Sequence, residues 1–127
     1  MGSPKTELGR GDDEVQHEVK ITQAYWLKET YAGNSDGKTH PVKGKAPNAW
    51  GLYDMLGNVW EWSWDWEADY GTGDQKDPVG PSTGSRRVVR GGSWYNDAWV
   101  ARAAYRFDVS PGYRVDNLGF RSARSIP

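Results

Sequence analysis

Hydrophobic and polar residues alternate strictly over residues 60–66 of the stretch VWEWSWDW, which spans residues 59–66. Every second residue is a tryptophan (Trp60, Trp62, Trp64 and Trp66), and the polar residues Glu61, Ser63 and Asp65 lie between them. Successive side chains of a strand point to opposite faces, so the pattern predicts a strand with four indoles on one face. Aromatic rows can bind sugars or bases. In a chain with few Leu and Ile, however, we expect these indoles to anchor the core, because each buried Trp removes about 150–250 Å² from water.

Three further segments have the pattern of short strands: residues 15–21 (VQHEVKI), 86–94 (RRVVRGGSW) and 118–123 (LGFRSA). Residues 31–48 and 71–85 are dense in turn-forming residues and are expected to be irregular loops. No period is sustained over residues 95–117. With 16 Gly and 7 Pro spread along the chain, the pattern predicts a minimal, loop-rich α+β fold with short strands and an aromatic core.

Composition is consistent with a single compact domain covering residues 1–127, since 36% of the residues are hydrophobic and 26% are charged. The formal net charge is −1, which gives no indication of nucleic acid or a membrane surface as a partner. No apolar run reaches membrane-spanning length, and no signal peptide opens the chain. The chain has no Cys, which excludes disulfides, a thiol nucleophile and a thiolate metal site.

Charge is divided unevenly along the chain. Residues 1–85 contain 8 Lys and Arg against 14 Asp and Glu, whereas residues 86–127 contain 8 Arg against 3 Asp. The cationic segment is compatible with a polyanion site. The structural alternative is favoured, because Arg lays its stem on aromatic rings and donates to carboxylates.

Two acids bracket a Gly-Asn turn in YDMLGNVWE, at Asp54 and Glu61. Carboxylate oxygens together with the carbonyls of such a turn are the ligands that Ca²⁺ prefers. A loop of this composition also occurs as a plain turn, so the spacing alone leaves both interpretations open.

Three segments in this order, PNAWGLYDMLGNVWEWSWDW, RVVRGGSW and NLGFR, resemble the formylglycine-generating enzyme or sulfatase-modifying factor family. The opening 22 residues resemble the same family's N-terminal segment. The resemblance implies a variant of the C-type lectin fold. It also implies a structural Ca²⁺ held by the side chains of Asp54 and Glu61 and the carbonyls of Gly57 and Val59.

The chain departs from this family in two ways. Enzymes of the family that oxidise a substrate cysteine rely on a pair of cysteines near the C-terminus, and this chain has none. We therefore expect no catalysis and no redox cofactor; His17 and His40, the two histidines, are interpreted as surface or turn residues. A middle segment with a motif like RLPTEAEWE is also missing near Thr30 and Tyr31, which leaves a natural minimal domain or a shortened chain as alternatives.

Residues 86–121 resemble the variable region of proteins diversified by retroelements, which use this lectin-type fold. Adenine changes within Asn codons yield a set of residues that excludes Lys, Glu, Gln, Met and Trp. The predicted ligand-binding positions all belong to the reachable set: Tyr95, Asn96, Asp97, Val100, Tyr105, Phe107, Asp108, Val109, Ser110, Gly112, Tyr113, Val115, Asp116 and Asn117. Trp94 is assigned to the scaffold, and Trp99 is left unassigned.

A residue count supports a variable region. Residues 1–90 contain 18 Lys, Glu, Gln and Met, and the same rate predicts about seven in residues 91–127, which contain none. The alternative is that ordinary relatives also have an Arg-rich end for packing. Beneath a variable surface, five arginines are expected to hold the scaffold: Arg90, Arg102, Arg106, Arg114 and Arg121.

Aromatic residues mixed with small polar residues are the composition of antibody-like binding surfaces. The sequence therefore predicts a non-catalytic ligand-binding protein whose partner is a protein or a cell-surface ligand, with neither nucleic acid binding nor membrane insertion. One alternative is a truncated, catalytically dead sulfatase-modifying-factor-like domain, and a weaker one is calcium-dependent sugar recognition. The sequence indicates neither an oligomeric state nor a compartment, although the resemblance is compatible with a virion or a cell surface.

Overall fold

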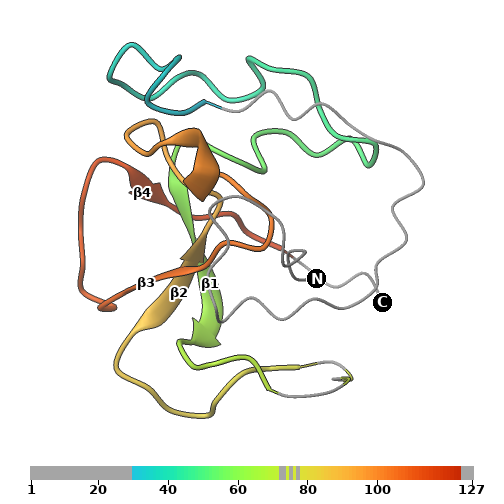
Figure 1. Cartoon of the computed structure of the whole chain (residues 1–127), viewed down its shortest axis with the longest axis vertical. Helices are drawn as coiled ribbons and strands as arrows, with labels where there is room; N and C mark the ends of the chain where they lie inside the picture. Colours follow the sequence, from blue (N-terminus) through green and yellow to red (C-terminus); the bar gives the residue numbers. More distant parts are fainter. Residues whose placement is uncertain (1–29, 72–73, 75, 77, 124–127) are drawn as a thin grey trace.

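The computed structural model describes residues 30–71, 74, 76 and 78–123 (Figure 1). The strand expected at residues 15–21 lies outside these described residues. The described elements are four strands and one 3₁₀ turn: β1 (Trp60–Trp66), β2 (Arg87–Arg90), η1 (Ala98–Val100), β3 (Phe107–Val109) and β4 (Leu118–Gly119). Long loops join them, so the expected fold class, loop-rich with short strands, is confirmed. Among the described residues, no helix has the length and apolarity to span a membrane.

The four strands form one open sheet in the order β3-β2-β1-β4 (Figure 1). β2 pairs antiparallel with both β1 and β3, whereas β4 pairs parallel with β1. The sequence predicted no element where β3 forms, because its three residues are too few to show a period. The strands expected at 86–94 and 118–123 are present but shorter, as β2 and β4.

The core lies on β2 and on the residues that cover it. Val88 and Val89 are adjacent in β2, and both are fully buried. Since neighbouring strand residues point to opposite faces, both faces of the sheet are covered at this point. Trp60, Val100 and Val109 form a cluster with Val89, and partly buried hydrophobic residues pack against it: Trp62, Tyr105 and Leu118.

The expectation that all four indoles of β1 are buried is wrong for Trp64. Trp60 is 7% exposed, whereas Trp64 is 86% exposed. The reason is a break in register: Trp62 pairs with Val89 and Trp66 with Arg87, so β1 contains two more residues than β2 between these pairs. The Arg87 guanidinium lies 3.5 Å from the centre of the Trp66 ring and 5.1 Å from that of Trp64.

The turn before β1 ties three distant segments together. Gly57 and Asn58 both have positive φ, 81° and 66°, and a Cβ at Gly57 would collide with the Thr30 backbone. Asn58 donates its backbone N–H to the Thr30 carbonyl, 2.9 Å away. Its side-chain amide also pairs with the His40 backbone, accepting from N at 3.0 Å and donating to O at 3.1 Å. This turn therefore holds the 30–40 loop against the sheet.

Candidate functional site

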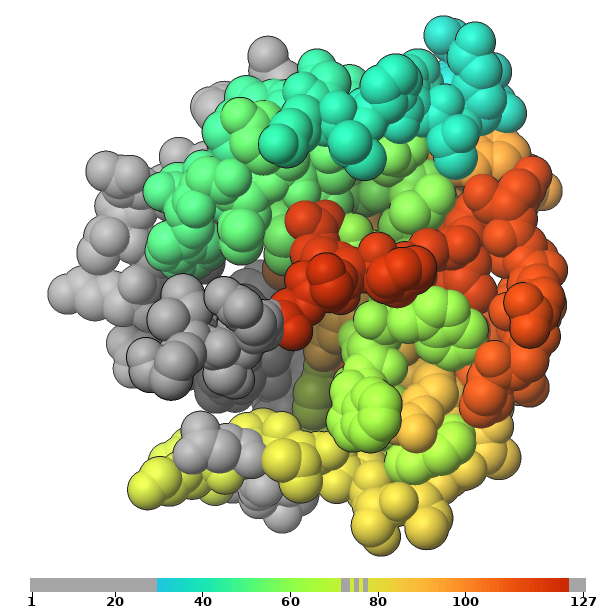
Figure 2. All heavy atoms as spheres, turned by 180° about the vertical axis from the view of Figure 1, so that it is seen from behind, coloured from blue at the N-terminus to red at the C-terminus, as the bar shows by residue number. Residues whose placement is uncertain are grey.

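The C-terminal segment that the sequence predicted as variable contributes three of the four strands and the loops between them (Figure 1). Eight of the predicted ligand-binding residues are exposed: Tyr95, Asp97, Phe107, Ser110, Gly112, Tyr113, Val115 and Asp116. Four are half-buried: Asn96, Tyr105, Asp108 and Asn117. We call the eight exposed residues the variable face. On the side of the molecule in Figure 2, the last described residues, in red, lie at the surface beside β1.

Aromatic side chains provide much of the exposed surface of the variable face. Tyr95 is 70% exposed, Tyr113 52% and Phe107 45%. Such rings offer large, rigid contact area at small entropic cost. Asp97, Ser110 and Asp116 add polar groups at exposed positions.

Val100 and Val109 do not belong to an exposed surface, which corrects their expected position. They are 5% and 7% exposed and lie in the core cluster with Trp60 and Val89. Val109 is the last residue of β3, and Val100 is the last residue of η1. A change of volume at either position alters core packing, whatever the codon allows.

The hydroxyl of buried Ser93 takes part in three hydrogen bonds with predicted ligand-binding residues. Ser93 is 1% exposed, and its hydroxyl donates to Asn96 Oδ1 at 2.5 Å. The same oxygen accepts from Asn117 Nδ2 at 3.2 Å and from the backbone N–H of Tyr95 at 3.4 Å. The backbone carbonyls of both Asn residues also accept hydrogen bonds, Asn96 from Ala32 and Asn117 from Trp60. These half-buried positions therefore join two loops.

A row of four aromatic rings runs from η1 to β3. The ring centres of Trp99 and Tyr105 are 5.5 Å apart, those of Tyr105 and Trp60 6.1 Å, and those of Trp60 and Phe107 5.7 Å. The Trp99–Tyr105 contact is edge-to-face, at 87°. Rings at these separations attract one another beyond simple area burial. Exposed Phe107 rests directly on the buried indole of Trp60, whereas exposed Trp99 is linked to it through Tyr105.

The arginines of the C-terminal segment make internal contacts that support their structural interpretation. Arg90 donates to the carbonyl of Ala103 at 3.1 Å. Arg106 donates to the carbonyl of Ala68 at 2.9 Å and lies 3.8 Å from the centre of the Tyr70 ring. Arg86 forms an ion pair with Asp108. These contacts engage guanidinium groups inside the protein, and a polyanion site would need such groups to be available to its ligand.

Two of the residues that the resemblance assigns to Ca²⁺, Asp54 and Glu61, contact an arginine in this structure. Arg121 donates to both carboxylate oxygens of Glu61, at 2.6 and 2.9 Å, and to the carbonyls of Tyr53 and Asp54, at 3.0 and 2.9 Å. The hydrogen bond to Glu61 raises the pKa of the guanidinium above its usual value, and the charge of Asp54 acts in the same direction.

This arrangement does not fit a calcium ion at Glu61. The Asp54 carboxylate accepts from the backbone N–H of Lys43 at 2.7 Å. Ca²⁺ takes 6–8 oxygen ligands, and here it would have to displace the guanidinium of Arg121 from Glu61. Gly57 and Val59 lie in the turn that leads into β1.

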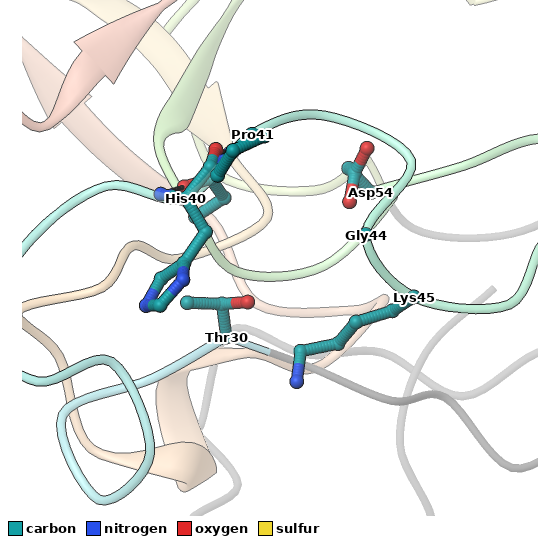
Figure 3. Close-up of a pocket in the computed structure, with 7 residues that line it drawn as sticks. Thr30, His40, Pro41, Gly44, Lys45 and Asp54 are labelled. Atoms are coloured by element: carbon teal, nitrogen blue, oxygen red, sulfur yellow. Dashed lines mark hydrogen bonds between the residues drawn. The ribbon is translucent and has the colours of Figure 1, made fainter.

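A separate small pocket of about 160 Å³ lies between the 30–45 loop and the turn before β1 (Figure 3). Its lining residues are Thr30, His40, Pro41, Gly44, Lys45, Asp54 and Asn58. The His40 ring nitrogen Nε2 is 2.8 Å from the Ser35 carbonyl, so this histidine has a structural contact in the turn where the sequence placed it. Asp54 is the one predicted site residue in the lining.

The sequence left Trp99, a surface residue within the predicted variable segment, unassigned. Trp99 is 48% exposed and lies in η1, between the predicted ligand-binding residues Asp97 and Val100. Its position between predicted ligand-binding residues indicated a place on the same surface, but Trp is not reachable from an Asn codon, so it was not included in the variable set.

Comparison with known proteins identifies the relatives of this chain. The model of the sulfatase-modifying factor enzyme 1-like domain matches residues 5–126. A formylglycine-generating enzyme of Streptomyces coelicolor is 44% identical over 90 residues, which cover 67% of this chain and 29% of that protein. An inactive C-alpha-formylglycine-generating enzyme 2 of Mus musculus is 40% identical over 91 residues, covering 67% and 26%.

A solved structure, that of Treponema denticola variable protein 1, is also similar. It is 52% identical with a TM-score of 0.69, and the match covers 72% of this chain and 34% of that one. The two expected resemblances, to the family and to a variable protein, are therefore confirmed. The chain spans between a quarter and about a third of the length of these three proteins.

Proposed function

This chain belongs to the sulfatase-modifying factor enzyme 1-like domain family, and we propose that it is a non-catalytic member that binds a protein or cell-surface ligand through its variable face. The similarity to a protein named a variable protein supports this assignment. In our proposal, a retroelement changes the residues of the face while the scaffold beneath them stays constant.

The observation that carries the proposal is the contrast between the exposed face and the buried groups beneath it. Tyr95 and Tyr113 are more than half exposed, whereas Trp60, Val89 and Ser93 are almost completely buried. Substitutions at exposed positions usually change stability by less than about 0.5 kcal/mol, whereas core substitutions commonly cost several times more. A binding surface that changes without loss of folding needs this separation.

Catalysis is not part of the proposal, because cysteine oxidation in this family relies on a cysteine pair and the 127 residues contain no Cys. A relative named as inactive shows that the family also includes proteins without this activity. The alternative, a truncated and catalytically dead domain, shares the lack of activity and differs in having no variable face.

A display library tests the proposed function. All eight residues of the variable face are encoded by Asn codons randomised at their adenines, and the proteins are displayed on yeast and treated with protease. We expect most members to remain resistant and binders of unrelated folded proteins to emerge. A control library uses the same codons at Val88, Val89, Val100 and Val109, and most of its members should be cleaved. Equal cleavage in both libraries, or no binders, would support the truncated-domain alternative.

The gene itself offers an independent test. A retroelement requires a near-repeat of codons 86–121 that differs chiefly at adenines and lies beside a reverse transcriptase gene. Copies of the gene should then differ at the exposed positions more often than at Val100 and Val109. A genome that encodes the protein without such a repeat would contradict variation by this route.

A further inference from the structure

Trp99 is held firmly by its backbone while its indole remains half exposed. In η1, Val100 N donates to the Asp97 carbonyl at 3.0 Å, and Ala101 N donates to the Ala98 carbonyl at 3.1 Å. The next residue, Val100, is buried in the core cluster. The Trp99 carbonyl accepts from Arg102 Nε at 2.8 Å. The position of the indole is therefore set by groups that do not depend on a ligand.

The aromatic row also supports the Trp99 ring from its inner side. Trp99 packs edge-to-face on Tyr105, which in turn packs on buried Trp60. Phe107 packs on the same Trp60 from β3, 45% exposed at the far end of the row. Two of these four rings, Trp60 and Trp99, are tryptophans, and the other two, Tyr105 and Phe107, are predicted variable positions. Residues at both variable positions thus rest against a tryptophan.

Trp99 differs from its neighbours in what the codons allow. Changes at the adenines of an Asn codon keep C or T as the third base, whereas the single Trp codon ends in G. If the variable face changes in the proposed way, Trp99 remains while the residues of that face are replaced. Trp is also among the residues most enriched where interfaces gain most of their binding energy.

We propose that Trp99 is a constant anchor of the variable face, inserting its indole into an apolar depression on each folded protein that the face binds. This inference rests on the proposed function. A folded protein is the partner favoured by the residue types, because exposed Asp97 and Ala98 precede Trp99 in the chain, and the exposed Tyr95, Ser110 and Tyr113 of the variable face complete a mixture typical of protein-binding surfaces. The constant indole supplies contact area, and the changing residues supply specificity.

The test extends the display library to position 99. The eight residues of the variable face and position 99 are randomised together, the latter with all twenty residues, and binders are selected against lysozyme, streptavidin and maltose-binding protein separately. We expect Trp to be recovered at position 99 in most binders of all three targets. In a purified binder, Trp99→Ala should weaken Kd by tenfold or more without lowering Tm by more than about 2 °C, and Trp99→Phe should weaken it less.

The matched control is Trp64→Ala, which removes the still more exposed indole of β1 and should leave Kd within threefold. Binders that show no preference for Trp at position 99, or a Trp99→Ala binder with unchanged Kd, would overturn the anchor and leave the proposed function standing. A library that yields no binders to any target would overturn both. A Trp99→Ala variant that unfolds would assign the residue to the core and likewise overturn the anchor.

Discussion

The side chains of Asn96 and Asn117, which lie far apart in the chain, meet at one buried atom, the hydroxyl oxygen of Ser93. This oxygen donates to Asn96 Oδ1 and accepts from Asn117 Nδ2. Both asparagines are among the predicted variable positions, yet each is half-buried and each backbone carbonyl is bonded to another segment. Changes at one of these positions therefore alter the hydrogen bonding available to the other.

Coupling between the two asparagines is the first testable consequence. We expect Asn96→Ala and Asn117→Ala each to lower the free energy of unfolding by about 1 kcal/mol, because each removes a hydrogen bond to a buried hydroxyl. The double variant should differ from the sum by at least about 0.5 kcal/mol, measured by urea unfolding. The exposed Ser110→Ala combined with Asn117→Ala should be additive. Additivity in both pairs would mean that Ser93 does not link the loops.

The exposed tyrosines should be replaceable without loss of stability. Tyr95→Ala and Tyr113→Ala remove side chains that are more than half exposed, so we expect each to change the free energy of unfolding by no more than about 0.5 kcal/mol. In contrast, Val100→Ala and Val109→Ala remove buried methyl groups and should each cost roughly 2 kcal/mol. Urea unfolding of the four variants compares the two groups. Similar costs for all four would place the tyrosines in the core.

Two tryptophans of β1, Trp60 and Trp64, should differ sharply in how much they stabilise the fold, although they occupy equivalent places in the alternating pattern. Trp60→Ala should lower the free energy of unfolding by about 3–5 kcal/mol, because the indole is 7% exposed and supports Tyr105 and Phe107. Trp64→Ala should cost no more than about 1 kcal/mol, since the Trp64 ring contacts the guanidinium of Arg87 at an exposed surface. Thermal unfolding of both variants makes this comparison. A large loss from Trp64→Ala would contradict the break in register.

Alternation predicted the position of β1, but it could not predict the break in its pairing. The pattern of Trp60, Trp62, Trp64 and Trp66 continues unbroken in the sequence. The break depends on the register with β2, which is set by contacts between residues distant in the chain. Trp64 consequently points outward although its local pattern is that of a core residue.

The candidate surface shows the same limit of local reasoning. The set of residues reachable from Asn codons is fixed by the genetic code and contains no information about burial. It therefore includes both Val109, which is buried, and Phe107, which is exposed. It excludes Trp99, whose exposure comes from η1 and from the packing of Tyr105 beneath it. Family resemblance predicted the fold correctly because its motifs cover almost the whole chain.

Arg121 should make the protein indifferent to calcium. Its guanidinium bonds to both oxygens of Glu61 and to the carbonyls of Tyr53 and Asp54, and the bond to Glu61 keeps its pKa raised, so it stays charged at every ordinary pH. A ligand that binds only the folded state raises its stability by mass action. We therefore expect Tm to be the same, within about 1 °C, in millimolar Ca²⁺ and in chelator.

Removing the guanidinium reverses this expectation. Arg121→Met keeps much of the side-chain volume but leaves the Glu61 carboxylate without its partner, and the pair is partly exposed, so the loss should be about 1 kcal/mol. Ca²⁺ should then raise the Tm of this variant measurably, because the two carboxylates and nearby carbonyls are hard oxygen ligands. Arg114→Met, at an exposed position, is the matched control and should not respond. If instead the unmodified protein gains several degrees from Ca²⁺, the ion displaces Arg121 and the calcium site implied by the family resemblance is the correct one.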